Sequence, residues 1–159
     1  MKKLWFGLLM SALMPVLLTA QSAFDGTWKI DLSKNQLPTK PDVYLLQDGM
    51  YHSKAVDSEM DIKADGHDHE FSGDSCYHTL SVNVVDEKTV EVTYKRSGRT
   101  VGTSKMTVSP DGNTALIEWS ESCNAKGDMV SGKRIMTLVA KGPARSHAIS
   151  GSWRYQCRH

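Results

Sequence analysis

Histidine and carboxylate side chains are concentrated in one stretch, Asp65-Gly66-His67-Asp68-His69-Glu70, and His78 follows shortly after it. If His67 and His69 lie on one strand, their two-residue spacing directs both imidazoles to the same face. Zinc sites use this geometry when a third ligand is near, here His78, Cys76 or a carboxylate. The stretch therefore raises the hypothesis of a metal-binding module. The alternative is that these residues only keep a turn and an edge strand polar.

Other chemistry-bearing patterns are missing from the sequence. There is no Gly-x-Ser-x-Gly motif to present a nucleophile, and Cys76 and His78, two residues apart, do not make a dyad by spacing alone. No glycine-rich loop opens a helix to bind phosphate. The 18 acidic residues are spread along the chain, and no pair is singled out for glycoside hydrolysis. We therefore expect no enzymatic activity and no cofactor.

The N-terminus has the architecture of a signal peptide spanning residues 1–20. Lys2 and Lys3 precede a fifteen-residue apolar run at 4–18, and Ala20 supplies a small residue before the expected cut. The competing interpretation is a membrane anchor. However, fifteen helical residues span only about 22 Å of a roughly 30 Å hydrocarbon core, and Pro15 interrupts the run. We expect an exported protein, periplasmic or secreted, with no membrane span in its mature form.

The chain has three cysteines, Cys76, Cys123 and Cys157. An oxidising compartment permits one disulfide among them and leaves one thiol over. The preferred pair is Cys76–Cys123, because both residues follow a serine in loop-like surroundings whereas Cys157 lies near the C-terminus. Three reduced cysteines remain the alternative, since spacing does not determine connectivity.

Removing residues 1–20 from the 159-residue chain leaves 139 residues, the size of one domain. Lys2 and Lys3 are removed with the leader, so the mature chain has 17 basic and 18 acidic side chains. This balance has neither the basic excess of a nucleic-acid-binding protein nor a polybasic membrane patch. We expect no nucleic-acid partner and a monomer.

Alternation of apolar and polar residues with a period of two dominates the mature chain and predicts strands. Strands are expected at residues 26–30, 43–47, 60–64, 68–71, 80–84, 90–94, 105–108, 114–119 and 133–140. Gly98 indicates a tight hairpin turn within 93–101, and Ser109-Pro110-Asp111-Gly112-Asn113 indicates a type I turn. Residues 31–37 are the one candidate for a helical turn. Short strands at this spacing predict an all-β, antiparallel up-and-down barrel of about 8–10 strands, with a β-sandwich as the alternative.

Three segments of the chain carry a resemblance to known sequences: Gly26-Thr27-Trp28-Lys29-Ile30-Asp31-Leu32-Ser33-Lys34, residues 89–99 and residues 107–114. Together they resemble a group of exported bacterial lipocalin-like proteins. The resemblance implies that Trp28, in the Gly-x-Trp opening motif, packs across the closed end of the barrel. It also implies that an arginine from a late strand stacks on this indole, with Arg134 and Arg154 as the two candidates.

The opening motif is echoed near the C-terminus by Gly151-Ser152-Trp153-Arg154. One hypothesis is that residues 149–159 contain the last strand of a single barrel whose main body is residues 21–148. The other is that they are the stub of a truncated second repeat, as in relatives where a second barrel-like half follows the motif.

The inward-facing positions of the expected strands are mostly apolar. A barrel of this size either fills its interior with side chains or holds one small ligand. We predict non-covalent binding of a small apolar or amphipathic molecule; the alternatives are a filled barrel without a ligand and the metal-binding module above. The expected pocket residues are Tyr44, Leu46, Phe71, Val82, Val92, Tyr94, Met106, Ile117 and Trp119. The other positions expected to face inward are Ile62, Leu80, Val84, Val90, Val108, Met136 and Leu138.

Overall fold

A computed structural model describes residues 40–55, 58–124 and 126–156. Several sequence predictions lie outside these residues. They are the signal peptide at 1–20, the strand at 26–30 with Trp28, the helical turn at 31–37, and Cys157.

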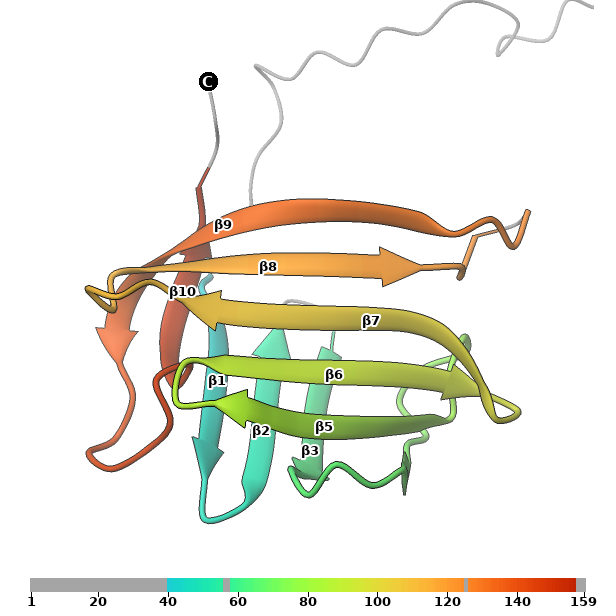
Figure 1. The fold of residues 1–159 in the computed structure, drawn as a ribbon, viewed down its shortest axis with the longest axis horizontal. Coiled ribbons are helices and arrows are strands. Elements are labelled where there is room, and N and C mark those ends of the chain that lie inside the picture. Colours follow the sequence, from blue (N-terminus) through green and yellow to red (C-terminus); the bar gives the residue numbers. More distant parts are fainter. Residues whose placement is uncertain (1–39, 56–57, 125, 157–159) are drawn as a thin grey trace, which may run out of the picture. The chain divides into compact units, whose positions relative to one another are not determined.

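The described residues form ten antiparallel strands and no helix (Figure 1). Their bounds are β1 Asp42–Gln47, β2 Met50–Ala55, β3 Ser58–Lys63, β4 His69–Glu70, β5 Thr79–Asp86, β6 Thr89–Arg96, β7 Arg99–Val108, β8 Thr114–Glu121, β9 Val130–Lys141 and β10 Gly151–Tyr155. In this part of the chain there is consequently no helix that could cross a membrane.

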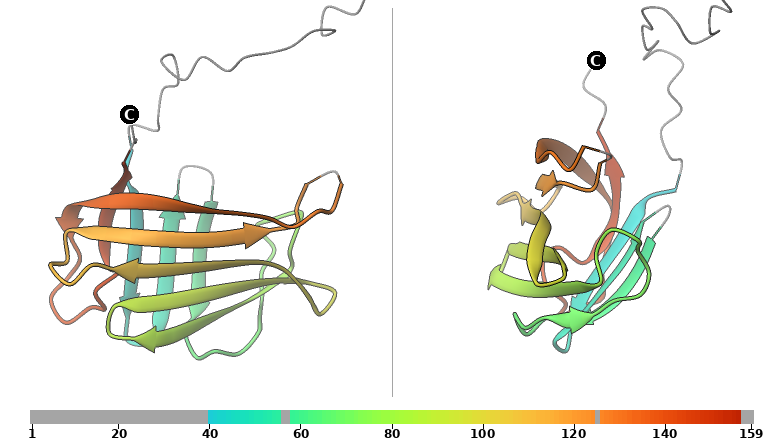
Figure 2. Two further views of the ribbon diagram at one scale, coloured as in Figure 1. Left: turned by 45° about the horizontal axis from the view of Figure 1, so that its top comes forward. Right: turned by 90° about the vertical axis from the view of Figure 1, so that its right-hand side faces the viewer.

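The strands make one sheet in the order β3-β2-β1-β10-β9-β8-β7-β6-β5-β4. The last strand, β10, pairs with both β9 and β1. The first and last strands of the meander are therefore hydrogen-bonded neighbours. The seam of the sheet lies instead where β3 approaches β5, next to the two-residue strand β4. The strands thereby curl into a nearly closed barrel (Figure 2). This confirms the predicted all-β, up-and-down barrel.

Two turns follow the sequence prediction closely. Ser97 and Gly98 both have positive φ, 50° and 75°, and join β6 to β7 as a two-residue hairpin. This turn type matches the twist of the flanking strands and favours glycine. Between β7 and β8, the Gly112 N–H donates to the Ser109 carbonyl at 2.9 Å, and Gly112 has a φ of 73°. Both turns set the register of β6, β7 and β8, whose inward side chains contribute to the core.

Apolar side chains from nine strands and one loop make a continuous core. Its members are Leu46, Tyr51, Met60, Ile62, Leu80, Val82, Val90, Val92, Met106, Val108, Ala115, Ile117, Met136, Ile149 and Trp153. Ile149 comes from the connection between β9 and β10, where the His147 N–H donates to the Leu46 carbonyl at 2.9 Å. This connection therefore lies against β1 and places Ile149 in the interior.

Two expectations about the strands are wrong. Strand β2 was not expected, because Met50-Tyr51-His52-Ser53-Lys54-Ala55 places serine and alanine at inward positions and so lacks apolar alternation. Val84 was expected to face inward but is 41 % exposed. Val84 pairs in regular register with Val90 but lies just before the irregularity at the end of β5, where it borders the open hollow near the β1–β2 turn.

The second Gly-x-Trp motif is an integral part of this barrel. Gly151 begins β10 with a φ of 152°, and a Cβ there would lie 2.6 Å from the Ala140 carbonyl oxygen. Trp153 is fully buried, and its Nε1–H donates to the Ile149 carbonyl at 2.8 Å. Residues 151–155 therefore form a strand of the barrel, paired with both β9 and β1.

Candidate functional site

A cavity of about 350 Å³ opens at the end of the barrel that carries the β6–β7 turn and the β8–β9 loop. Residues from eight strands and two loops line it. They are Asp42, Tyr44, Tyr51, Ser53, Ala55, Met60, Asp74, Tyr77, Tyr94, Val101, Gly102, Thr103, Ser104, Ile117, Trp119, Ser120, Glu121, Cys123, Arg134 and Tyr155. Binding sites for small molecules have volumes of about 300–1,000 Å³, so this cavity is at the small end of that range.

Deeper in the barrel the interior is filled. The space between Tyr44, Tyr51, Val92, Met106 and Ile149 amounts to only about 20 Å³. A larger hollow of about 480 Å³ lies outside the barrel, near the β1–β2 turn, and is lined largely by exposed residues such as Asp48, Glu87 and Arg145. The cavity at the open end is therefore the enclosed space best suited to hold a molecule.

Tyrosine rings make much of the cavity wall. Tyr77 and Tyr94 have ring centroids 4.7 Å apart, and those of Tyr44 and Tyr51 are 6.5 Å apart. Burial raises the pKa of Tyr51 to about 12 and also raises the pKa of Tyr44 and Tyr94. These hydroxyls therefore stay protonated near neutral pH, and the charge in the cavity comes from other residues.

Arg134 contributes a positive charge on the inner face of β9. Its guanidinium carbon lies 5.4 Å from the ring centroid of Trp119 and 5.5 Å from that of Tyr155. Its Nη1 donates to the Tyr155 hydroxyl at 3.1 Å. Cation–π contacts at exposed sites are worth about 0.5–1 kcal/mol each, so two rings and a hydrogen bond together favour this position of the exposed Arg134 side chain.

Asp42, at the start of β1, is an unusual residue to find in a barrel interior. It is 2 % exposed, and its Oδ2 atom is buried with no hydrogen-bond partner among the described residues. Burial raises the pKa of the carboxyl group, and the neighbouring Tyr155 hydroxyl and the charge of Arg134 oppose this only in part. Buried acceptors without a partner are rare and costly, so this carboxylate requires an explanation.

We predict that Asp42→Asn makes the protein more stable at pH 7, by roughly 1 kcal/mol, which is the lower end of the cost of a buried unpartnered group. Because the folded-state pKa is raised, ionisation of Asp42 destabilises the fold as pH rises through the unfolded-state and then the folded-state pKa. The difference between variant and wild type should therefore disappear near pH 3. Urea unfolding at both pH values measures it, and equal differences at the two pH values would contradict this account.

Gly132 makes room for Trp119 on the neighbouring strand. The two residues are directly paired between β8 and β9, and a Cβ at position 132 would lie 2.7 Å from the Trp119 ring. A glycine in the middle of a strand often marks such a close approach. Gly132 therefore allows the indole to lie against the sheet, next to Arg134.

We predict that Gly132→Ala displaces the Trp119 ring and destabilises the protein by about 1–3 kcal/mol, the usual cost of overpacking. Ser131→Ala, at the exposed neighbouring position, is the matched control and should change stability by less than about 0.5 kcal/mol. Urea unfolding monitored by tryptophan fluorescence tests both variants. Equal stability of the two variants would show that the indole tolerates the added methyl group.

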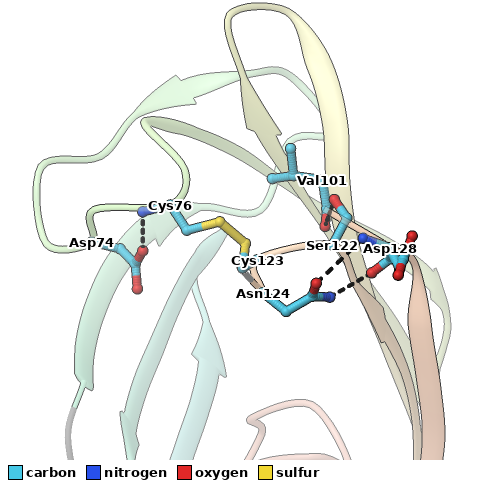
Figure 3. The surroundings of a disulfide bond; sticks show 7 residues. All are labelled: Asp74, Cys76, Val101, Ser122, Cys123, Asn124 and Asp128. Atoms are coloured by element: carbon cyan, nitrogen blue, oxygen red, sulfur yellow. Dashed lines mark hydrogen bonds between the residues drawn. A yellow bond between two sulfur atoms is a disulfide. The ribbon is translucent and has the colours of Figure 1, made fainter. Parts of the chain in front are cut away.

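A disulfide between Cys76 and Cys123, the pair preferred from the sequence, lies at the rim of the cavity (Figure 3). It joins the β4–β5 connection to the segment that follows β8. The Cys76 N–H donates to Asp74 Oδ1 at 2.6 Å, and the Ser122 N–H donates to the Val101 carbonyl at 2.8 Å. The crosslink therefore fixes Asp74 and Tyr77 to the opposite wall of the cavity.

The nine residues expected to form a pocket are distributed between the cavity and the core. Tyr44, Tyr94, Ile117 and Trp119 line the cavity. Val92 and Met106 line the small space beneath it. Leu46 and Val82 belong to the buried core, and Phe71 stacks on Tyr77 with ring centroids 5.6 Å apart. The expected pocket thus combines cavity residues with the packing that supports them.

Sequence reasoning missed the polar part of the cavity. Asp42, Ser53, Ser104 and Tyr155 occupy inward positions of their strands but are polar, and period-two patterns assign such residues to the outer face. For Tyr155 the sequence does contain a signal of its inward position. Gly151, Trp153 and Tyr155 occupy every second position of one strand and so lie on the same face.

The two candidate partners for an end-closing tryptophan differ in position. Both side chains are exposed, but Arg134 lies over the ring of Trp119 at the cavity, whereas Arg154 lies next to the buried Trp153 in sequence. The described residues therefore contain an arginine–tryptophan pair, although its indole comes from β8. The pairing with Trp28 lies outside the described residues.

The histidine-rich stretch does not assemble a metal site. Strand β4 starts at His69, so His67 lies before the strand. The two imidazoles therefore do not share one face of a strand. Asp65 organises the turn: its Oδ1 accepts the His67 N–H at 3.0 Å and lies 2.8 Å from His69 Nε2, and these hydrogen bonds lower its pKa. Among the described residues no three His, Cys, Asp or Glu side chains form a metal-binding group, and His78 does not complete one.

The described residues thus define a class of protein, an antiparallel up-and-down β-barrel with a tyrosine-rich cavity at one end. Comparison with known proteins adds nothing to this class, because no family model, curated protein sequence or solved structure matches the chain.

Proposed function

We propose that this chain is an exported, lipocalin-like protein that binds a small amphipathic molecule non-covalently in its barrel. The observation that carries the proposal is the cavity of about 350 Å³, which combines aromatic walls with a few polar groups. Binding pockets for small molecules have this composition, because apolar walls supply affinity and the polar groups fix orientation.

The position of the cavity favours binding over a purely structural barrel. The core beneath it is closely packed, with only about 20 Å³ of free space, so the cavity does not result from poor packing throughout the barrel. The disulfide at the rim and the stacked Arg134 hold the walls in place before a ligand arrives. A preformed site loses less entropy on binding than a flexible one.

A neutral apolar fluorophore, N-phenyl-1-naphthylamine, tests the proposal. We expect a saturable, one-to-one increase of its fluorescence with the wild-type protein. Ser104→Trp should fill the cavity and weaken binding about tenfold or more, because Ser104 lies on the cavity wall. Lys105→Trp adds the same ring at the next, exposed position of β7 and should leave binding unchanged. Equal binding by both variants would place the fluorophore elsewhere.

Native mass spectrometry of the exported protein tests the proposal without a chosen probe. The protein mass reports whether residues 1–20 are removed and whether the chain is a monomer. An additional mass that is lost on denaturation would identify a bound small molecule. A barrel that neither carries such a mass nor binds the fluorophore would be a structural protein without a ligand.

A further inference from the structure

The ionisable side chains in the cavity are mostly acidic. Three carboxylates line it, Asp42, Asp74 and Glu121, against one guanidinium, that of Arg134. Asp42 differs from the other two because they are exposed at the rim whereas it is buried within the barrel. The cavity therefore favours a ligand with positive charge.

Asp42 also has unused hydrogen-bonding capacity. Its Oδ2 has no partner among the described residues, although the Tyr155 hydroxyl and Arg134 are close enough to influence its ionisation. On the adjacent strand, Trp153 is paired with Asp42, and its Nε1–H is already donated to the Ile149 carbonyl. The Asp42 side chain lines the cavity but its Oδ2 is closed to a water-sized molecule, so a donor in the cavity reaches this oxygen once the carboxylate rotates toward it.

Aromatic rings surround the same space. Tyr44, Tyr51, Tyr77, Tyr94, Trp119 and Tyr155 all line the cavity. The faces of such rings attract cations, and the chain already uses this attraction to hold Arg134 over Trp119 and Tyr155. Tyr44, two residues after Asp42 on β1, and Tyr51 on β2 are not part of the described cation–π pairs of this arginine.

From the buried oxygen, the acidic excess and the aromatic walls, we propose that the ligand carries a protonated amino group. The ammonium is held by the Asp42 carboxylate, and the apolar part of the ligand lies between the tyrosine rings. This inference rests on the proposed function, and it names the chemical class of the ligand as a small aromatic or aliphatic amine.

An anion bound to Arg134 is the competing occupant. The guanidinium already donates to Tyr155 and stacks on two rings, so it has less unmet capacity than Asp42. An anion would also meet three carboxylates in the same cavity. The structure therefore favours the amine.

Three probes of similar size separate these cases: 2-phenylethylamine, 2-phenylethanol and 3-phenylpropionate, which are cationic, neutral and anionic at pH 7. Each is titrated by calorimetry to about 10 mM, because ligands this small bind in the micromolar to millimolar range. We expect the amine to bind about tenfold more tightly than the alcohol and the propionate to bind most weakly.

Asp42→Asn should weaken amine binding about tenfold while leaving alcohol binding within about twofold. Asp61→Asn removes one charge from the exposed face of β3 and is the matched control; amine binding should be unchanged. Urea unfolding of each variant confirms that it is folded, and Asp42→Asn is expected to stabilise the free protein.

The outcomes distinguish this inference from the proposed function. If the alcohol or the propionate binds as tightly as the amine, or if Asp42→Asn keeps the full preference for the amine, the amine inference is wrong while small-molecule binding stands. If none of the three probes binds and N-phenyl-1-naphthylamine does not bind either, the proposed function itself fails.

Discussion

Replacing both Cys76 and Cys123 by serine is expected to lower the free energy of unfolding by about 4 kcal/mol. The disulfide closes a loop of 47 residues, and a crosslink of that length restricts the unfolded chain by this amount in the loop-entropy description. Because a domain of this size is stable by only about 5–15 kcal/mol, the loss is a large part of the total. Urea unfolding of the double variant under non-reducing conditions measures it.

A reductant supplies the control for the disulfide prediction. Wild-type protein treated with a reducing phosphine should become as unstable as the Cys76→Ser, Cys123→Ser variant, and the variant should not respond to the reductant. Cavity binding should also weaken, because the crosslink fixes the segment that carries Tyr77 and Asp74. A double variant as stable as the wild type would show that the crosslink is not formed in the purified protein.

Trp153→Ala is the second large effect, and we expect a loss of about 3–5 kcal/mol. The indole is fully buried in the middle of the core, and its Nε1–H donates to the Ile149 carbonyl. Removing it leaves a cavity beside Asp42 and also frees the carbonyl of the β9–β10 connection. Urea unfolding followed by far-ultraviolet circular dichroism measures the change without relying on tryptophan emission.

Two further variants separate the contributions of the Trp153 ring and its hydrogen bond from those of the exposed neighbouring position. Trp153→Phe keeps an aromatic ring but not the hydrogen bond, and it should cost less than the alanine variant. Arg154→Ala, at the next and exposed position of β10, should change stability by less than about 0.5 kcal/mol. If Trp153→Ala cost no more than Arg154→Ala, the indole would not be part of the core.

Local patterns were sufficient to predict the barrel. Strands β6 and β8 alternate apolar and polar residues over most of their length, β7 does so over residues 105–108, and the turns at Gly98 and Gly112 join the three strands in order. By contrast, β2 carries Ser53 and Ala55 toward the cavity, so its inner face is not apolar and no period-two signal identifies it. A strand that lines a partly polar cavity is less recognisable from sequence than one that lines a packed core.

The cavity itself was predictable only in its aromatic part. Tyr44, Tyr94 and Trp119 follow the apolar alternation, and the sequence therefore places them inside. Asp42 is charged and buried, and Arg134 is charged and lines the cavity while remaining exposed; charged residues are rarely fully buried, so no rule of periodicity assigns either to the cavity. Their position depends on the pairing of β1, β9 and β10, which are distant in the sequence.

The seam of the sheet and the first and last strands of the meander lie at different places around the barrel. β1 and β10 are hydrogen-bonded neighbours, whereas β3 and β4 are consecutive in sequence but do not pair. A circularly permuted chain that starts at β4, continues from β10 through a short linker into β1, and finishes at β3 would therefore keep all nine strand pairings. The connectivity of this barrel can thus be rearranged without changing the walls of its cavity.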